Sequence, residues 1–216
     1  MSALMWVDVF NANAYGTNCW LLSADPSDEA VVVDPGFSPD AVHVMLETAG
    51  KTPVAVLATH AHLDHVGRAG DFAGEMPMYV HEADAVAFTD ESAWRAGFDN
   101  PLAPVKDLRT IADADVLRLA GLEIAVLHTP GHTPGHCAFR LDADVALCSG
   151  DLVFAGAIGR SDFANSDPVA MQASLRRFLE FPDTVPVLPG HGPDTTVGRE
   201  RSSNPFLRDG SRSGAG

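Results

Sequence analysis

The stretch "THAHLDH", which ends at His65, constrains this chain most, because it places three histidines and an aspartate directly after an apolar run. In an extended segment alternate side chains point to the same side, so His60 and His62 can reach one ion. Asp64 and His65 follow where the chain turns toward a short helix, expected to run on from Val66, and they could bind a second ion. Packing these polar groups together is costly unless a cation holds them. The stretch therefore predicts a strand that ends at a metal site.

Three further motifs place a histidine or a carboxylate just after an expected strand and beside a glycine. They are His132 in "HTPGHTPGH", Asp151 in "CSGD" and His191 in "LPGHGP". A glycine lets the backbone approach a crowded site closely. Three His or carboxylate ligands per ion, with an open position for water, are typical of catalytic rather than structural zinc. The motifs therefore predict a catalytic metal centre.

Short apolar runs alternate with helical patterns along most of the chain. One helix is expected over 38–50, with Ser38 as the cap, Pro39 in the first turn and Gly50 at the end, and another over 167–181. Two similar βα-rich halves favour an α/β fold, a four-layer αβ/βα sandwich of two mixed sheets with helices on the outer faces, over a doubly wound sheet. The expected strands lie within 6–10, 18–23, 30–36, 53–60, 76–81, 116–129, 136–142, 144–151 and 185–191.

One domain is expected over residues 1–207, because no Pro-, Gly- or Ser-rich linker divides the chain. The periodic pattern weakens over 90–107, which predicts a long loop of the kind that often binds ligands. The Gly/Ser-rich segment 208–216 is expected to be a disordered tail.

The formal net charge of −15 at pH 7 disfavours nucleic acid and anionic membranes as partners, because both are bound through clustered Lys and Arg. The first residues lack the basic and apolar regions of a signal peptide, and no run approaches the ~18 apolar residues of a membrane span. Three widely spaced cysteines suit buried thiols in a reducing compartment. We therefore expect a cytoplasmic protein with a small-molecule substrate, and its oligomeric state stays open.

In their order along the chain, "THAHLDH", "PGHTPGH", "SGD" and "PGHGP" resemble the motifs of the metallo-β-lactamase superfamily, and the resemblance covers about residues 6–206. It implies two metal ions. Matched by position, it assigns His60, His62 and His132 to the first ion, Asp64, His65 and His191 to the second, and Asp151 as a bridge between them. It also matches Asp34 of "DPG" to an aspartate that braces the histidine loop.

Within that superfamily, "GHTPGH", the sequence that follows His191 and the loop "GAIGRSDF" are similar to short glyoxalase II-like hydrolases. This likeness implies hydrolysis of a thioester of the S-(2-hydroxyacyl)glutathione type, such as S-lactoylglutathione. Glyoxalase II itself has a C-terminal helical extension that contacts glutathione, whereas this sequence ends soon after Phe206.

The chemistry expected of such a centre is attack by a hydroxide that bridges two divalent ions. The ions lower the pKa of their shared water from 15.7 to about 7. Asp151 would hold the ions together, and Asp64 would orient the hydroxide as well as bind metal. A thiolate leaves without strong acid assistance, which favours a thioester over an amide. Zinc is the expected metal, with iron and manganese as alternatives.

Five side chains are candidates for holding the substrate. Arg160, Arg199 and Arg201 could bind a substrate carboxylate. Phe154 and Phe163 could form walls of the pocket. Another histidine, His136, sits four residues after His132 and could support a ligand through a hydrogen bond.

Other functions stay open on the sequence alone. A mononuclear iron persulfide dioxygenase of the same fold would use His60, His132 and Asp151 as two histidines and one carboxylate. Those relatives carry "GHTDGC" where this chain reads "GHTPGH". A lactonase or β-lactamase is disfavoured by the missing secretion signal, and a nuclease by the negative charge. A metal-buffering or scaffold protein is expected to lack some ligands, whereas all seven are present.

Overall fold

The computed structural model describes residues 5–11, 14–89 and 102–208. Within these ranges the strands form two six-stranded sheets and a two-stranded hairpin. The first sheet has the order β1-β2-β3-β4-β5-β6. Its strands are β1 (Met5–Asn11), β2 (Asn18–Ala24), β3 (Glu29–Val33), β4 (Thr52–Leu57), β5 (Pro77–His81) and β6 (Asp107–Ile111).

The second sheet has the order β14-β13-β10-β9-β8-β7. Its strands are β7 (Val116–Leu119), β8 (Leu122–His128), β9 (Cys137–Leu141), β10 (Ala146–Gly150), β13 (Pro186–Pro189) and β14 (Thr195–Thr196). The hairpin pairs β11 (Val153–Phe154) with β12 (Ala157–Ile158).

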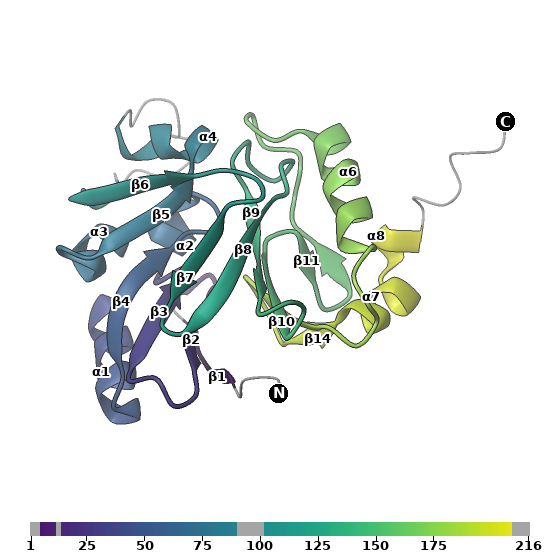
Figure 1. Cartoon of the computed structure of the whole chain (residues 1–216). Coiled ribbons are helices and arrows are strands. Elements are labelled where there is room, and N and C mark those ends of the chain that lie inside the picture. Colours follow the sequence, from purple (N-terminus) through teal and green to yellow (C-terminus); the bar gives the residue numbers. More distant parts are fainter. Residues whose placement is uncertain (1–4, 12–13, 90–101, 209–216) are drawn as a thin grey trace, which may run out of the picture.

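Helices lie on the outer side of each sheet, with α1 and α3 beside the first and α6 and α7 beside the second (Figure 1). The helices are α1 (Pro39–Ala49), α2 (Leu63–Val66), α3 (Ala69–Ala73), α4 (Glu82–Ala85), the 3-10 helix η1 (Val86–Phe88), α6 (Pro168–Phe178), α7 (Val197–Ser203) and α8 (Pro205–Arg208). This order of helix, sheet, sheet and helix confirms the predicted four-layer sandwich. None of the helices in the described ranges has the length and apolar character to cross a membrane.

Alternation of apolar side chains along the central strands produces these layers. On β2, Cys19 and Leu21 pack with the outer helices, whereas Trp20 and Leu22 pack against the second sheet. Successive side chains on a strand point to opposite faces, so a strand that is apolar at every position is buried on both sides.

The histidine stretch enters its helix earlier than predicted. We expected a helix from Val66 onward, but α2 begins at Leu63, directly after the extended residue His62. The backbone N–H groups of His65 and Val66 donate to the His62 carbonyl at 3.0 and 3.1 Å. Asp64 and His65 therefore lie within the first helical turn rather than before it.

Strand β6, which we had not predicted, begins at Asp107, where the expected loop over 90–107 ends. Residues 90–101 of that loop lie outside the described residues, but the chain from Asp107 pairs in parallel with β5. Only Ile111 of β6 is fully buried, so its sequence carries a weak strand signal. We also had not predicted β11, β12, β14, α7 or α8. Of the expected tail 208–216, Arg208 ends α8 and the rest lies outside the described residues.

Parallel pairing determines where the polar residues after the strands meet. Strands β3, β4 and β5 are parallel neighbours, so Asp34, His60 and Asp84, which follow them, lie along one edge of the first sheet. Strands β10 and β13 are also parallel, which brings Asp151 and His191 to one edge of the second sheet.

Candidate metal centre

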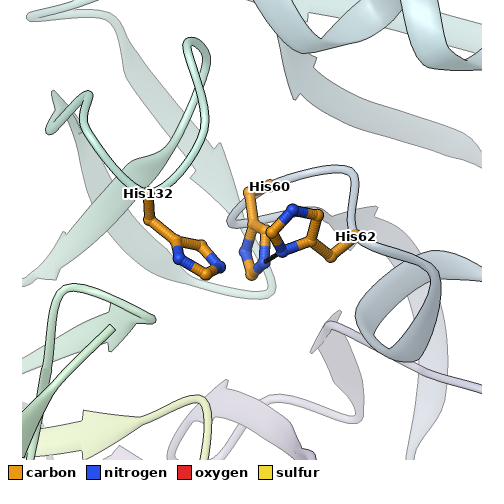
Figure 2. Close-up of side chains that lie close together, drawn as sticks. All are labelled: His60, His62 and His132. Atoms are coloured by element: carbon orange, nitrogen blue, oxygen red, sulfur yellow. Dashed lines mark hydrogen bonds between the residues drawn. The ribbon is translucent and has the colours of Figure 1, made fainter. Parts of the chain in front are cut away.

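The seven predicted metal ligands lie together where the strand ends of the two sheets meet. Figure 2 shows His60, His62 and His132 turned toward one another from two separate loops. The ligand atoms fall into three overlapping groups, and within each group they lie within 4.8 Å of one another. The groups are His60 with His62 and His132, His60 with His65 and Asp151, and Asp64 with His65 and His191.

Asp34 braces the histidine loop, as predicted, and thereby orients two rings. Its carboxylate accepts hydrogen bonds from the Thr59 backbone N–H at 2.8 Å and the Thr59 hydroxyl at 2.7 Å. Because that hydroxyl donates to Asp34, it accepts from His60 Nδ1 at 3.0 Å. His65 Nδ1 lies 2.9 Å from Asp34 Oδ2 and donates to it. Both imidazoles therefore direct Nε2 into the cluster.

His132 is oriented in the same way by a different group. Its Nδ1 lies 2.7 Å from the carbonyl oxygen of Arg160, which can only accept a hydrogen bond. Burial lowers the pKa of His132, so the ring is neutral and Nε2 carries a lone pair. His132 Nε2 lies 3.3 Å from Asp151 Oδ2. Two electron-pair donors that face each other in a buried site repel unless a cation lies between them.

The arrangement therefore fits a metal ion. Among the described residues, His132 Nε2 is a buried atom without a hydrogen-bond partner. Buried polar atoms are rarely left unpaired in proteins, so this atom indicates a group that the protein itself does not supply. A divalent cation would satisfy His132 Nε2 and the neighbouring carboxylate together.

The charges of the cluster are also adapted to a cation. Burial, with His132 and His65, lowers the pKa of His62 to about 3, so this ring is neutral and available as a ligand. Burial opposes ionisation of Asp151, but His65, together with His132 and His191, outweighs burial and lowers the pKa of that carboxyl well below its usual range. Burial likewise opposes charge on His65, yet Asp151 and Asp64 raise its pKa. In the metal-free protein a proton on His65 thus balances the carboxylates.

Asp64 and His191 complete the side of the cluster near β2. Asp64 Oδ2 accepts a hydrogen bond from the Thr17 hydroxyl at 2.8 Å and lies 3.3 Å from His191 Nε2. A side chain at Gly190 would collide with Asp151 Oδ1. The predicted role of glycine beside this histidine is therefore confirmed.

His136 supports Asp151 through the backbone, as the sequence suggested. Its Nε2 accepts the backbone N–H of Asp151 at 3.0 Å, so Nδ1 carries the ring proton and donates to the Thr129 hydroxyl at 2.8 Å. Burial lowers the pKa of His136 to about 3, which keeps the ring neutral and preserves this arrangement.

Two of the predicted pocket residues border the cluster through their rings. The Phe163 ring meets His62 edge-on, with centroids 5.4 Å apart, and the Phe154 ring meets His191 in the same way at 5.6 Å. The guanidinium of Arg160 lies 4.4 Å from the centroid of the Phe163 ring and pairs with Asp162 at 2.9 Å. An arginine and an aromatic ring therefore stand together beside His62.

Among the described residues, the other two arginines form no hydrogen bond or ion pair with the seven predicted ligands. Arg199 is exposed on α7, and its backbone N–H donates to the Thr196 hydroxyl at 3.2 Å. Arg201 donates to the carbonyl oxygens of Leu179 and Phe181 and pairs with Asp183, so it holds the turn after α6.

Sequence reasoning missed Asp84, which is buried beside the ligand loops and bonded to both. A signal was present, because Asp84 follows a strand that is parallel to β4, as Asp34 does.

Comparison with known proteins agrees with the motifs. The family model "Metallo-beta-lactamase superfamily" matches residues 12–191. Hydroxyacylglutathione hydrolase GloC of Haemophilus influenzae is 34% identical over 209 residues, which cover 94% of this chain and 98% of GloC. The crystal structure of the B3 metallo-β-lactamase BLEG-1 is similar with a TM-score of 0.83 and 33% identity, covering 94% of this chain and 99% of that one. The crystal structure of TTHA1623 in a di-iron-bound form is similar with a TM-score of 0.81 and 38% identity. The match covers 93% of this chain and 100% of TTHA1623.

Proposed function

The chain belongs to the metallo-beta-lactamase superfamily, and on this premise we propose that it hydrolyses thioesters of the S-(2-hydroxyacyl)glutathione type with two divalent metal ions. The general assignment, that the chain is a metallo-hydrolase of this superfamily, rests on the family match and on the relatives named above. The substrate, the number of ions and their identity are the proposal. One observation carries it: all seven proposed ligand side chains are present, and they gather into three overlapping groups, each of which could hold a metal ion.

The residues present would hold two ions as follows. His60, His62 and His132 would bind the first, and Asp64, His65 and His191 the second. Asp151 would bind both, because its Oδ2 lies 3.3 Å from His132 Nε2 and its Oδ1 lies 3.4 Å from His65 Nε2. The metals, when bound, supply a hydroxide at neutral pH and polarise the substrate carbonyl. Zinc suits this donor set, and the di-iron form of TTHA1623 makes iron the next candidate.

The protein's own side chains contribute orientation. Asp64, fixed by the Thr17 hydroxyl, holds an acceptor oxygen in the cluster that can orient an attacking O–H group. The Nδ1 bonds of His60, His65 and His132 prevent these rings from rotating during turnover. A thiolate, with a free pKa of about 8.5, can leave without a dedicated proton donor.

Substrate recognition is proposed to rest on Phe163 and Arg160. The exposed guanidinium of Arg160 can reach a substrate carboxylate, since its present partner, Asp162, is itself exposed and forms a weak surface pair. Phe163 offers an apolar surface beside His62 for the substrate's carbon chain.

The test is a metal count on purified protein by plasma mass spectrometry, with hydrolysis of S-lactoylglutathione followed in the same sample. We expect two ions per chain and hydrolysis that tracks metal content. One iron per chain, with oxygen consumed on glutathione persulfide and little hydrolysis, would contradict the proposal and favour a persulfide dioxygenase.

Replacing Arg160 by alanine should raise KM for S-lactoylglutathione roughly 10-fold, the scale of one hydrogen bond to a charged group, and leave the metal content unchanged. The backbone carbonyl that orients His132 is retained in this variant, which separates the side chain's role from the loop's. Steady-state kinetics of Arg160→Ala beside Arg118→Ala, an exposed arginine paired with Glu123, provide the comparison. Equal KM values for the two variants would show that Arg160 does not bind the substrate.

A further inference from the structure

Asp84 is a buried carboxylate between the two loops that carry the first group of ligands. It lies on α4, the short helix after β5, and its exposed fraction is 0%. Neither the chemistry proposed above nor the seven ligands involve it. A buried carboxylate is costly to maintain unless its oxygens accept hydrogen bonds, so its partners indicate what it does.

Three donors hold the Asp84 carboxylate, and they come from both ligand loops. Oδ2 accepts the backbone N–H of Ala61 at 3.0 Å and the Thr133 hydroxyl at 2.8 Å. Oδ1 accepts the backbone N–H of Gly135 at 2.6 Å. Ala61 lies between His60 and His62, and Thr133 directly follows His132. One carboxylate thus ties together the segments that supply all three histidines of the first group.

The Gly135 backbone lies so close to Asp84 that no residue with a side chain fits at position 135. A Cβ at position 135 would lie 2.6 Å from the Asp84 carboxylate, so the loop approaches this tightly only because Gly135 has no side chain. Burial raises the pKa of Asp84 to about 6, against the effect of its three hydrogen bonds. The group is therefore ionised, and able to accept all three bonds, at neutral pH.

The residue before α4 also supports the loop that contains His132, through contacts that do not involve Asp84. His81, the residue before the helix, stacks on His128 with ring centroids 3.9 Å apart. His128 Nε2 donates to the Pro134 carbonyl at 2.8 Å, one residue from Thr133. The loop that contains His132 is thus supported by His81 and His128 independently of Asp84, so loss of the carboxylate alone should leave it folded.

We propose that Asp84 is a positioning residue for the first metal site: it sets the separation between the His60–His62 segment and His132, and it has no direct influence on the second site. The second site is held instead by Asp34, through His65, and by Thr17, through Asp64. This inference rests on the proposed binding of two ions.

The test measures stepwise dissociation constants for Zn²⁺ by competition with a chromophoric chelator. In Asp84→Asn an NH₂ group replaces one acceptor oxygen and faces the loop donors. We expect the first-site affinity to fall about 10- to 100-fold, the usual effect of removing a group that orients ligands. The second-site affinity should change less than about threefold. Thr133→Val removes one of the three bonds and should weaken the same site to a smaller extent.

Two backgrounds identify the affected site. In His191→Ala, which lacks a proposed second-site ligand, Asp84→Asn should still lower the Zn²⁺ affinity. In His62→Ala, which lacks a proposed first-site ligand, Asp84→Asn should leave the remaining Zn²⁺ affinity unchanged. Glu200→Gln is the matched control, because Glu200 is also 0% exposed and accepts from three donors, but outside the ligand loops. Its Zn²⁺ constants should equal those of the wild type.

The outcomes separate the two proposals. Wild-type protein that binds no Zn²⁺ would overturn the proposed function, and this inference with it. Wild-type protein that binds two ions, with Asp84→Asn unchanged or equally weakened in both backgrounds, would overturn the positioning role alone. If Asp84→Asn does not fold, Thr133→Val decides: a first-site loss supports the role, and unchanged constants refute it.

Discussion

Replacing Asp151 by alanine should remove both proposed metal ions and lower kcat/KM for the proposed substrate, S-lactoylglutathione, at least about 1,000-fold, the scale of losing an essential catalytic group. The Asp151 carboxylate lies among histidines of both proposed sites. Oδ1 lies 3.4 Å from His65 Nε2, and Oδ2 lies 3.3 Å from His132 Nε2 and 3.6 Å from His191 Nε2. One substitution therefore deprives both proposed sites of a charged ligand.

Asp151→Ala should lose more bound metal than a variant in which one of the proposed histidine ligands is removed. Without Asp151 the remaining carboxylate of the cluster is Asp64, and the histidines, no longer beside a second negative charge, bind cations less strongly. Plasma mass spectrometry after gel filtration gives the metal content, and circular dichroism shows whether the variant is folded. Glu123→Ala, which removes an exposed surface carboxylate, is the control. Two ions per chain in folded Asp151→Ala would refute the assignment of Asp151 as a ligand of both.

Removal of the metals should lower the melting temperature of the wild-type protein by roughly 8–16 °C. At free metal about 1,000 times above the dissociation constant, binding stabilises the folded state by about 4 kcal/mol. A domain of this size shifts by about 2–4 °C per kcal/mol. The stabilisation arises because neutral histidine rings and ionised carboxylates converge on the place of the ion. Among them, His132 Nε2 is buried without a hydrogen-bond partner in the protein, and a bound cation would satisfy it.

Calorimetry with and without a chelator measures this effect, with the metal restored to the chelated sample to show reversal. In Asp151→Ala the chelator should change the melting temperature by less than about 2 °C, because little metal is bound to remove. A wild-type melting temperature that does not respond to chelation would contradict a metal-stabilised cluster.

Much of the fold followed from local patterns. The alternating apolar runs predicted β2, β3 and β10, and the cap and stop signals of α1 placed it correctly, with Pro39 first and Gly50 in the left-handed conformation after its end. Strand β6 was missed because only one of its residues is fully buried. The start of α2 was placed too late, since the carbonyl of His62, rather than a recognisable capping side chain, begins the helix.

The candidate site divides in the same way. The resemblance to the metallo-β-lactamase superfamily matched Asp34 of "DPG" to an aspartate that braces the histidine loop, and the contacts of Asp34 bear this out. Asp84 was not predicted, because "HEAD" on a short helix has the composition of an exposed acidic turn. It becomes buried only when the loop of His132, from the other sheet, folds over it.

The sequence by itself determined the types of the seven proposed ligands and their positions in the segments that follow strands, because strand period and turn residues are local properties of the chain. Only the tertiary structure decided which ring nitrogen each histidine presents and that Arg160 orients His132 through its carbonyl oxygen. The tertiary structure also decided that Arg201 donates a hydrogen bond to the Leu179 carbonyl, in the turn after α6. These features depend on contacts between loops of different sheets, and no local pattern encodes such contacts.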